Sequence, residues 1–224
     1  MAAIELTNID KSFGTGISRV AVLKDISFTA DLGELSLILG PSGSGKSTLL
    51  TIMGGLQTPD KGTVLIDQQD LGELSSKQRD QLRLNKIGFV LQSYNLLPYL
   101  NIRDQFKLVD RIKRQGNLTA AALDHLLEEL GIDQLLNQYP GELSGGQNQR
   151  VAIARALYTD PQIILADEPT AALDSNRVRV VGKILRQMAQ DHRKAVIVVT
   201  HDMRLREFAD HIYQLMDGRL TKEE

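Results

Sequence analysis

Cysteine is absent from the 224 residues, which excludes disulfide bonds and thiolate metal sites. A chain without cysteine fits a reducing compartment. Excess charge is also small, because 26 lysines and arginines against 28 acidic residues leave a formal net charge of −2. Proteins that bind nucleic acid usually carry a clustered basic excess, so we expect no nucleic-acid partner.

Long apolar runs are missing as well. The longest, such as Leu35 to Leu39 and Ala195 to Val199, fall far short of the roughly 18 residues that a membrane-spanning helix needs. The first residues, Met1 to Glu5, lack the charged and then apolar pattern of a secretory signal. We therefore expect any role at a membrane to come through a partner.

The pattern of apolar residues predicts one α/β domain over residues 1–224, with a mainly helical insertion at about 93–140. Continuous apolar strands indicate a parallel sheet that is covered on both faces. The predicted helices are Gly45 to Gly54, Ala120 to Leu130 after the N-cap Thr119, and a helix from Ser144 to about Tyr158. The predicted strands are Ile4 to Phe13, Val20 to Phe28, Leu35 to Leu39, Thr63 to Ile66, Ile87 to Leu91, Ile163 to Ala166 and Ala195 to Val199, followed by a hairpin over His211 to Leu220.

A glycine-rich segment between a predicted strand and a predicted helix has the form GxxxxGK[ST], which is typical of phosphate-binding loops. It consists of Gly40, Pro41, Ser42, Gly43, Ser44, Gly45, Lys46 and Ser47. Bare glycine backbone and a helix N-terminus favour bound phosphate. We expect Lys46 at the β- and γ-phosphates, Ser47 on Mg²⁺ and Thr48 near the α-phosphate. The competing interpretation is a glycine-rich turn without a ligand.

Two acids follow the apolar strand Ile163 to Ala166. A carboxylate delivered by such a strand is suited to binding the Mg²⁺ of a bound nucleotide, and we assign Asp167 to that role. Glu168 is then the candidate that polarises the attacking water. In isolation, the two acids could also be a solvated pair at a strand end.

A second glycine pair, in Leu143-Ser144-Gly145-Gly146-Gln147, precedes Gln149 and Arg150. With the phosphate loop and the acidic strand, this segment resembles the signature of ATP-binding cassette (ABC) proteins. The resemblance implies a P-loop NTPase fold, with a mainly parallel sheet, an N-terminal antiparallel β-subdomain and a helical insertion. It further implies that Ser144, Gly145, Gly146 and Gln147 meet the γ-phosphate of an ATP held by the opposite subunit.

The resemblance covers nearly the whole chain and assigns four more residues. Gln92 stands where the family has a glutamine that contacts Mg²⁺ and water, and His201 stands where it has a histidine that reaches the γ-phosphate. Asp174 belongs to a segment that lines the dimer seam. Phe13 occupies the place of the aromatic residue that stacks on adenine, although a core or hairpin role for Phe13 stays open.

Finer details resemble the subgroup of ABC proteins that serves lipoprotein release, macrolide efflux and bacitracin-type resistance. They are Gly54-Gly55-Leu56, the segment Phe89 to Pro98 and the segment Leu165 to Thr170, whereas Ala171-Ala172 departs from the pattern. The resemblance implies an ATPase with ATP and Mg²⁺ that works as a head-to-tail homodimer on the cytoplasmic face of the cell membrane.

A permease partner is implied too, and we expect it to dock near Tyr94 to Leu100, where large apolar residues crowd a short segment. The bland alternative is that these residues pack beneath the helical insertion. Two other functions remain open: a non-transport ATPase that acts on cell-wall or division machinery, and a soluble ABC protein that acts on nucleic acid or the ribosome.

Overall fold

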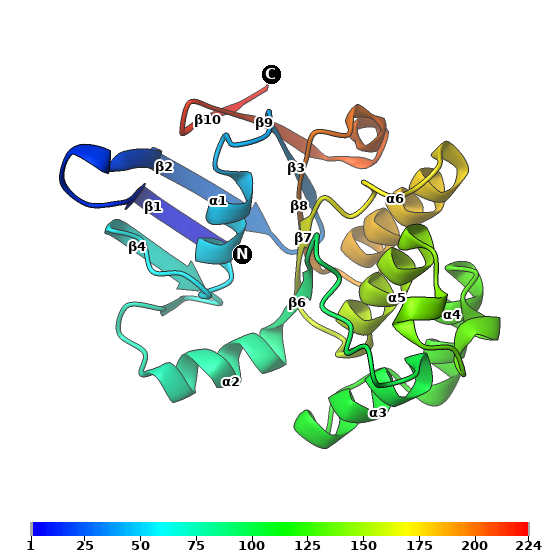
Figure 1. The fold of residues 1–224 in the computed structure, drawn as a ribbon. Helices are drawn as coiled ribbons and strands as arrows, with labels where there is room; N and C mark the ends of the chain where they lie inside the picture. Colours follow the sequence, from blue (N-terminus) through cyan, green and yellow to red (C-terminus); the bar gives the residue numbers. More distant parts are fainter. Residues whose placement is uncertain (1, 224) are drawn as a thin grey trace.

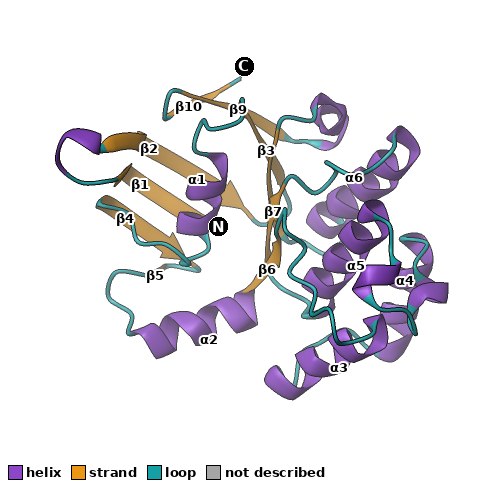
Figure 2. Ribbon diagram, in the orientation of Figure 1, coloured by secondary structure: helices purple, strands orange, loops and turns teal. Residues whose placement is uncertain are grey.

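A computed structural model describes residues 2–223, which form two sheets and a group of helices (Figures 1 and 2). The strands are β1 (Ala2–Phe13), β2 (Val20–Asp31), β3 (Leu35–Leu39), β4 (Lys61–Ile66), β5 (Gln69–Asp70), β6 (Ile87–Val90), β7 (Ile163–Asp167), β8 (Ala195–Thr200), β9 (His211–Met216) and β10 (Arg219–Lys222). The α-helices are α1 (Lys46–Met53), α2 (Ser76–Lys86), α3 (Ile102–Ile112), α4 (Ala120–Glu129), α5 (Gly145–Tyr158) and α6 (Ser175–Gln190). Short 3₁₀ helices are η1 (Gly16–Ser18), η2 (Asp133–Leu135), η3 (Pro140–Glu142) and η4 (Met203–Phe208).

The central sheet has six strands in the order β10-β9-β3-β8-β7-β6, and every neighbouring pair in it except β9–β10 is parallel. A second, antiparallel sheet has the order β2-β1-β4-β5. In Figure 1 the helix α1 lies between the two sheets, and α3 to α6 gather on the far side of the central sheet. The predicted fold class is confirmed.

Alternating side chains of the central strands fill two separate cores. On β7, Ile164 and Ala166 belong to the core shared with α3 to α6, whereas Ile163 and Leu165 belong to the core shared with α1 and the antiparallel sheet. Strand β8 divides in the same way. Since successive residues of a strand point to opposite faces, a strand buried on both sides must be apolar throughout, as the sequence predicted.

The predicted strands are present, and the terminal hairpin turns at Asp217 and Gly218, which both have positive φ as a tight hairpin of this kind requires. Two helices were missed. Helix α2 begins with a capping box formed by Ser75 and Gln78, and α6 begins at the N-cap Asp174. The glycines at the ends of the predicted helix 45–54 are its caps and lie outside α1.

Gly54 generates a stability prediction, because it ends α1 where Phe89 of β6 crosses. A Cβ added there would lie 2.0 Å from Phe89 Cζ and 3.0 Å from Leu165 Cδ1. Overpacking of this kind costs about 1–3 kcal/mol, so Gly54→Ala should lower the free energy of unfolding by that amount in urea titrations. The matched control is Gly141→Ala, whose added methyl group meets nothing within 4 Å and should change stability by less than about 0.5 kcal/mol.

Candidate functional site

Strand register brings the candidate residues to one edge of the central sheet. Leu39 of β3 lies beside Thr200 of β8, and Val199 of β8 lies beside Asp167 of β7. Because these strands are parallel, the segments that begin at Gly40, Glu168 and His201 leave the sheet at the same edge. The phosphate loop, the acidic pair and the histidine are therefore neighbours, although they are far apart in the sequence.

The phosphate loop has a backbone that only glycine suits at two positions. A Cβ on Gly40 would lie 2.4 Å from the carbonyl oxygen of Leu215, and Gly45, the N-cap of α1, has a φ of +100°. A side chain at either position would force the loop away from β9 or β2. The loop therefore presents bare backbone in front of the α1 N-terminus, which is the arrangement that binds phosphate.

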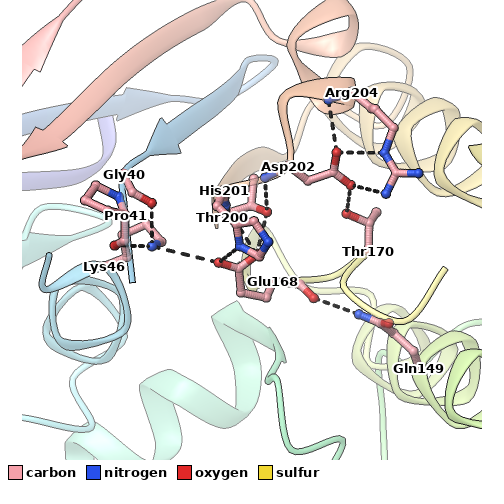
Figure 3. A network of polar contacts seen from close by, with 10 residues as sticks. All are labelled: Gly40, Pro41, Lys46, Gln149, Glu168, Thr170, Thr200, His201, Asp202 and Arg204. Atoms are coloured by element: carbon pink, nitrogen blue, oxygen red, sulfur yellow. Dashed lines mark hydrogen bonds and ion pairs between the residues drawn. The ribbon is translucent and has the colours of Figure 1, made fainter. Parts of the chain in front are cut away.

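Lys46 is 7% exposed and lies within this loop. Its ammonium donates to the carbonyl oxygens of Gly40 (2.8 Å) and Pro41 (2.9 Å) and lies 3.9 Å from Glu168 Oε1 (Figure 3). A buried ammonium needs anionic or carbonyl partners, and three hydrogen bonds are available to it. The side chain is thus placed for contact with an anion bound in the loop.

Asp167 is buried, and its Oδ1 has no hydrogen-bond partner among the described residues. Burial raises the pKa of Asp167 above its ordinary value, although a hydrogen bond with Ser47 and the Lys46 ammonium act in the opposite direction. An unpaired carboxylate oxygen beside a serine hydroxyl is a donor set that Mg²⁺ accepts.

Within residues 2–223 no group of three or more histidine or acidic side chains could hold a metal ion. Magnesium is commonly bound by one or two protein ligands together with phosphate oxygens and water. Asp167 and Ser47 fit that pattern: they would hold the ion, and the ion would neutralise charge on the phosphates.

Glu168 has a left-handed backbone, with a φ of +49°. Its carboxylate accepts a hydrogen bond from Thr200 Oγ1 (2.6 Å) and lies 3.0 Å from His201 Nδ1. Positive φ is uncommon for residues other than glycine and is often found at functional sites. The contacts with β8 and with His201 turn the Glu168 side chain toward Lys46, as Figure 3 shows.

The segment after Glu168 is fixed by a second network. Thr170 Oγ1 donates to Asp202 Oδ2 (2.7 Å), and Arg204 donates to both carboxylate oxygens of Asp202 (Figure 3). Burial by itself would raise the pKa of Asp202, but hydrogen bonds from Arg204 and Thr170 outweigh it and hold the pKa below its ordinary value. The aspartate therefore stays ionised and holds residue 170 to the segment that follows His201.

The predicted signature residues lie apart from the phosphate loop. Ser144 caps α5, its Oγ accepting from the amide of Gln147, while the Gln147 side chain accepts from the Ser144 amide. Within the described chain, no hydrogen bond links residues 144–147 to residues 40–48 of the phosphate loop. The α5 N-terminus, with exposed Ser144 and Gly145, faces outward, so these residues cannot complete the nucleotide site of their own chain.

Asp174 and Gln92 are exposed, and in the part of the chain that the structure describes no hydrogen bond or ion pair joins them to Asp167 or Glu168. Asp174 is the N-cap of α6, and backbone hydrogen bonds from Arg177 and Asn176 lower its pKa. Gln92 follows two residues after Val90, the last residue of β6, and Val90 lies beside Ala166 of β7. It therefore leaves the sheet at the same edge as Asp167.

Phe13 is 43% exposed at the end of β1, where it pairs with Val20 of β2. Lys11 Nζ lies 5.7 Å from its ring centroid. A cavity of about 400 Å³ opens between the β2 strand and the phosphate loop, and its lining includes Val20, Val22, Pro41, Ser42 and Gly43. Val20, the strand partner of Phe13, lines this space, whereas Phe13 itself does not.

The sequence did not predict the contacts of three side chains that hold the site together: Thr200, Gln149 and Arg155. Gln149 donates to the Glu168 carbonyl oxygen (2.7 Å) from α5. Arg155, also on α5, donates to the carbonyl oxygens of Tyr94 (2.9 Å) and Asn95 (2.6 Å). The acceptors lie 19 to 61 residues away in sequence from these donors, and no local sequence pattern predicts contacts over such separations.

The chain is similar to known proteins over almost its whole length. The family model described as "ABC transporter" matches residues 23–171. The chain is 45% identical over 222 residues to the protein named "Putative hemin import ATP-binding protein HrtA" of Staphylococcus aureus (strain Newman), covering 98% of this chain and 99% of that one.

Among solved structures, a dimeric post-hydrolysis state of the ATP-binding cassette MJ0796 bound to ADP and Pi is 38% identical, with a TM-score of 0.91, and covers 99% of this chain and 98% of that one. The ATP binding subunit of an ABC transporter has a TM-score of 0.83 at 22% identity, covering 99% and 89% of the two chains, and supports the fold.

The position of Lys46 predicts a binding defect. Lys46→Ala removes a charge-assisted contact to phosphate, so we expect the affinity for Mg-ATP to fall about tenfold or more in calorimetric titrations. Lys86→Ala removes a lysine that pairs with Asp67 outside the site, and it should leave the affinity unchanged. Equal affinities in the two variants would remove Lys46 from the phosphate site.

Proposed function

Since the chain belongs to the ABC transporter family, as an ATP-binding subunit that hydrolyses ATP, we propose that it powers a membrane permease by closing and opening as a head-to-tail dimer. The proposal rests most on one observation. Glu168 lies 3.0 Å from His201 and 3.9 Å from Lys46, directly after the buried Asp167. These distances support the roles proposed for the four side chains: a general base, its orienting partner, a phosphate contact and a magnesium ligand.

Each of these side chains has a separate role in the proposal. Asp167, Ser47 and Gln92 would hold Mg²⁺, and Lys46 would contact the β- and γ-phosphates together with backbone amides of the loop. Glu168 accepts a proton from the attacking water, and His201 holds the Glu168 carboxylate and reaches toward the γ-phosphate. The Thr200 hydroxyl, fully buried, fixes the second oxygen of Glu168.

Dimerisation follows from where the α5 N-terminus lies. Each chain has one phosphate loop and one outward-facing signature segment, Ser144 to Gln147, and the two do not meet within a chain. A second copy related by twofold symmetry places each signature segment over the nucleotide of the other subunit. Asp174 and the neighbouring segment then line the seam, in support of which Ala172 lies against Gly145 and Gly146. The MJ0796 cassette was solved as a dimer.

Adenine is placed on Phe13 in this proposal. The ring is 43% exposed, and its strand partner Val20 lines the cavity that reaches residues 41–43, which supports a stacking role. Its exposure argues against the core role that the sequence left open. Base–aromatic stacking is worth about 1–3 kcal/mol.

We place the permease contact on the docking segment, Tyr94 to Leu100, and the adjoining side of α3. Tyr99 is 72% exposed, whereas Leu96 packs partly against the helical core. One part of the docking segment therefore packs against the core, and another part is exposed to a partner. The buried Gln105 fixes its shape by donating to the carbonyl oxygens of Leu97 and Leu100.

A cavity of about 340 Å³ adjoins the docking segment, lined by Leu100, Asp104, Lys107, Leu108 and Arg111. Lys107 forms an ion pair with Asp104, so the charges of these two side chains cancel. Arg111 then gives the rim of the cavity a net positive charge. Two leucines beside a basic rim suit a short cytoplasmic helix of the permease that carries an acidic residue.

The domain assignment and location belong to the same proposal. We treat residues 1–224 as one ATPase domain whose helical insertion spans about 93–140 and continues into α5. None of the helices in residues 2–223 is long and apolar enough to cross a membrane. The chain would then be held at the cytoplasmic face of the membrane by its permease.

Direction and cargo rest on two different likenesses. The segments around Gly54, Phe89 to Pro98 and Leu165 resemble the lipoprotein-release, macrolide and peptide-resistance subgroup, which favours an export-type permease. The 45% identical relative is named for hemin import. Hemin is therefore the first cargo to assay, in both directions, in vesicles that contain the permease. If the co-purified permease drives no transport, the cell-wall or division role replaces the transport role.

Removing the proposed base generates the central prediction. Glu168→Gln keeps the side-chain shape and should lower ATP turnover roughly 10²–10⁴-fold while ATP binding is retained. His201→Ala should lower turnover in the same way. Phosphate-release assays measure the rates, and sedimentation of Glu168→Gln with Mg-ATP should show a dimer. Near-normal turnover would refute the base, and a monomer under these conditions would refute the dimer.

The docking segment generates a second prediction. Tyr99→Glu places a charge on an exposed side chain, so the isolated subunit should fold and bind ATP normally but fail to co-purify with the permease or be stimulated by it. Leu56→Glu adds the same charge at an exposed apolar residue outside the segment and serves as the control. Normal assembly and stimulation of the Tyr99 variant would move the docking site elsewhere.

A further inference from the structure

Gln149 lies one turn into α5, is 2% exposed, and uses both halves of its carboxamide on backbone groups of another segment. Its Nε2 donates to the carbonyl oxygen of Glu168 at 2.7 Å, and its Oε1 accepts from the amide of Ala172 at 3.1 Å. The first of these contacts crosses from α5 to the segment after β7 in Figure 3. One side chain therefore joins the signature helix to the stretch 168–172.

The backbone of Glu168 is held on both sides. Its amide donates to the carbonyl oxygen of Val199 at 2.9 Å, and its own carbonyl accepts from Gln149. These two contacts constrain the peptide groups on either side of a residue with a φ of +49°, a conformation that persists only when its surroundings enforce it. The direction of the Glu168 side chain follows from that backbone.

Burial alone does not require an amide at position 149. A leucine or methionine would fill a buried position on α5, and a buried amide costs free energy unless both its donor and its acceptor are paired. The neighbouring Asn148 differs, because it donates to the carbonyl oxygens of Pro140 and Leu143 in the loop before its own helix. Gln149 alone of the two reaches the acidic segment.

We propose that Gln149 is a positioning residue for Glu168, and that it ties the aim of this carboxylate to the position of the α5 N-terminus. The inference rests on the proposed role of Glu168 as the base. In the proposed dimer, the α5 N-terminus meets the nucleotide of the opposite subunit, while Glu168 serves the nucleotide of its own. Gln149 thus links the two nucleotide sites: engagement of α5 with one of them sets the base at the other.

A double-mutant cycle tests this, with Gln149→Met and Glu168→Gln alone and together. Methionine keeps the length and removes the amide. We expect Gln149→Met to lower kcat about tenfold with unchanged affinity of the subunit for Mg-ATP. In the Glu168→Gln background, the same substitution should change the residual single-turnover rate by less than about twofold, because the group it positions is already gone.

A purely structural role gives a different result. If Gln149→Met lowers the rate by the same factor in both backgrounds, or weakens ATP binding, the inference is overturned. Asn148→Met is the matched control on the same turn of α5, and any loss it causes should be equal in the two backgrounds. Should Gln149→Met lose its cooperative unfolding transition, Gln149→Leu replaces it in the cycle, since it also removes the amide and fills the buried position with an apolar side chain.

The cycle separates the two ideas. Near-normal turnover in Glu168→Gln alone refutes the proposed base, and the inference about Gln149 falls with it. A full loss in Glu168→Gln, combined with equal factors for Gln149→Met, overturns the inference and leaves the base in place.

Discussion

The parallel register of β3, β8 and β7 is the constraint on which the site depends. Leu39 pairs with Thr200, and Asp167 with Val199, so three segments that the chain visits far apart leave the sheet at one edge. The register is fixed because a slip by one residue would exchange the two apolar faces of each strand. Both faces are buried, in different cores. Packing in the two cores thus fixes the strand register, and the register fixes the distances between the phosphate loop, the acidic pair and His201.

The two cores also place the phosphate-loop helix and the signature helix on opposite faces of the central sheet. Helix α1, which follows the phosphate loop, packs in the core on one side of the sheet, and the signature helix α5 packs in the core on the other. Glu168 has partners from both sides: its carboxylate lies 3.9 Å from Lys46 of α1, and its carbonyl oxygen accepts from Gln149 of α5.

Much of this could be predicted from the sequence, for identifiable reasons. Continuous apolar strands such as Ala195 to Val199 indicate burial on both faces, and the phosphate loop and the acid pair follow from spacing. Helices α2 and α6 were not predicted, although Ser75, Gln78 and Asp174 carry capping signals; α2 buries only Leu82, so its apolar pattern is weak. The partners of Gln149, Thr200 and Arg155 could not be predicted, since each depends on the relative placement of elements that only the folded core determines. Local sequence contains no record of that placement.

Arg155 restricts the shape of the docking segment, and this affects how a partner can recognise that segment. Its guanidinium binds the carbonyl oxygens of Tyr94 and Asn95, two consecutive residues with positive φ. A free loop of this composition would sample many conformations, and a binding partner would have to select one at a cost in conformational entropy. Here α5 has already restricted them. If the permease docks on this segment as proposed, it meets a surface whose shape α5 sets, and a rotation of α5 would change that shape.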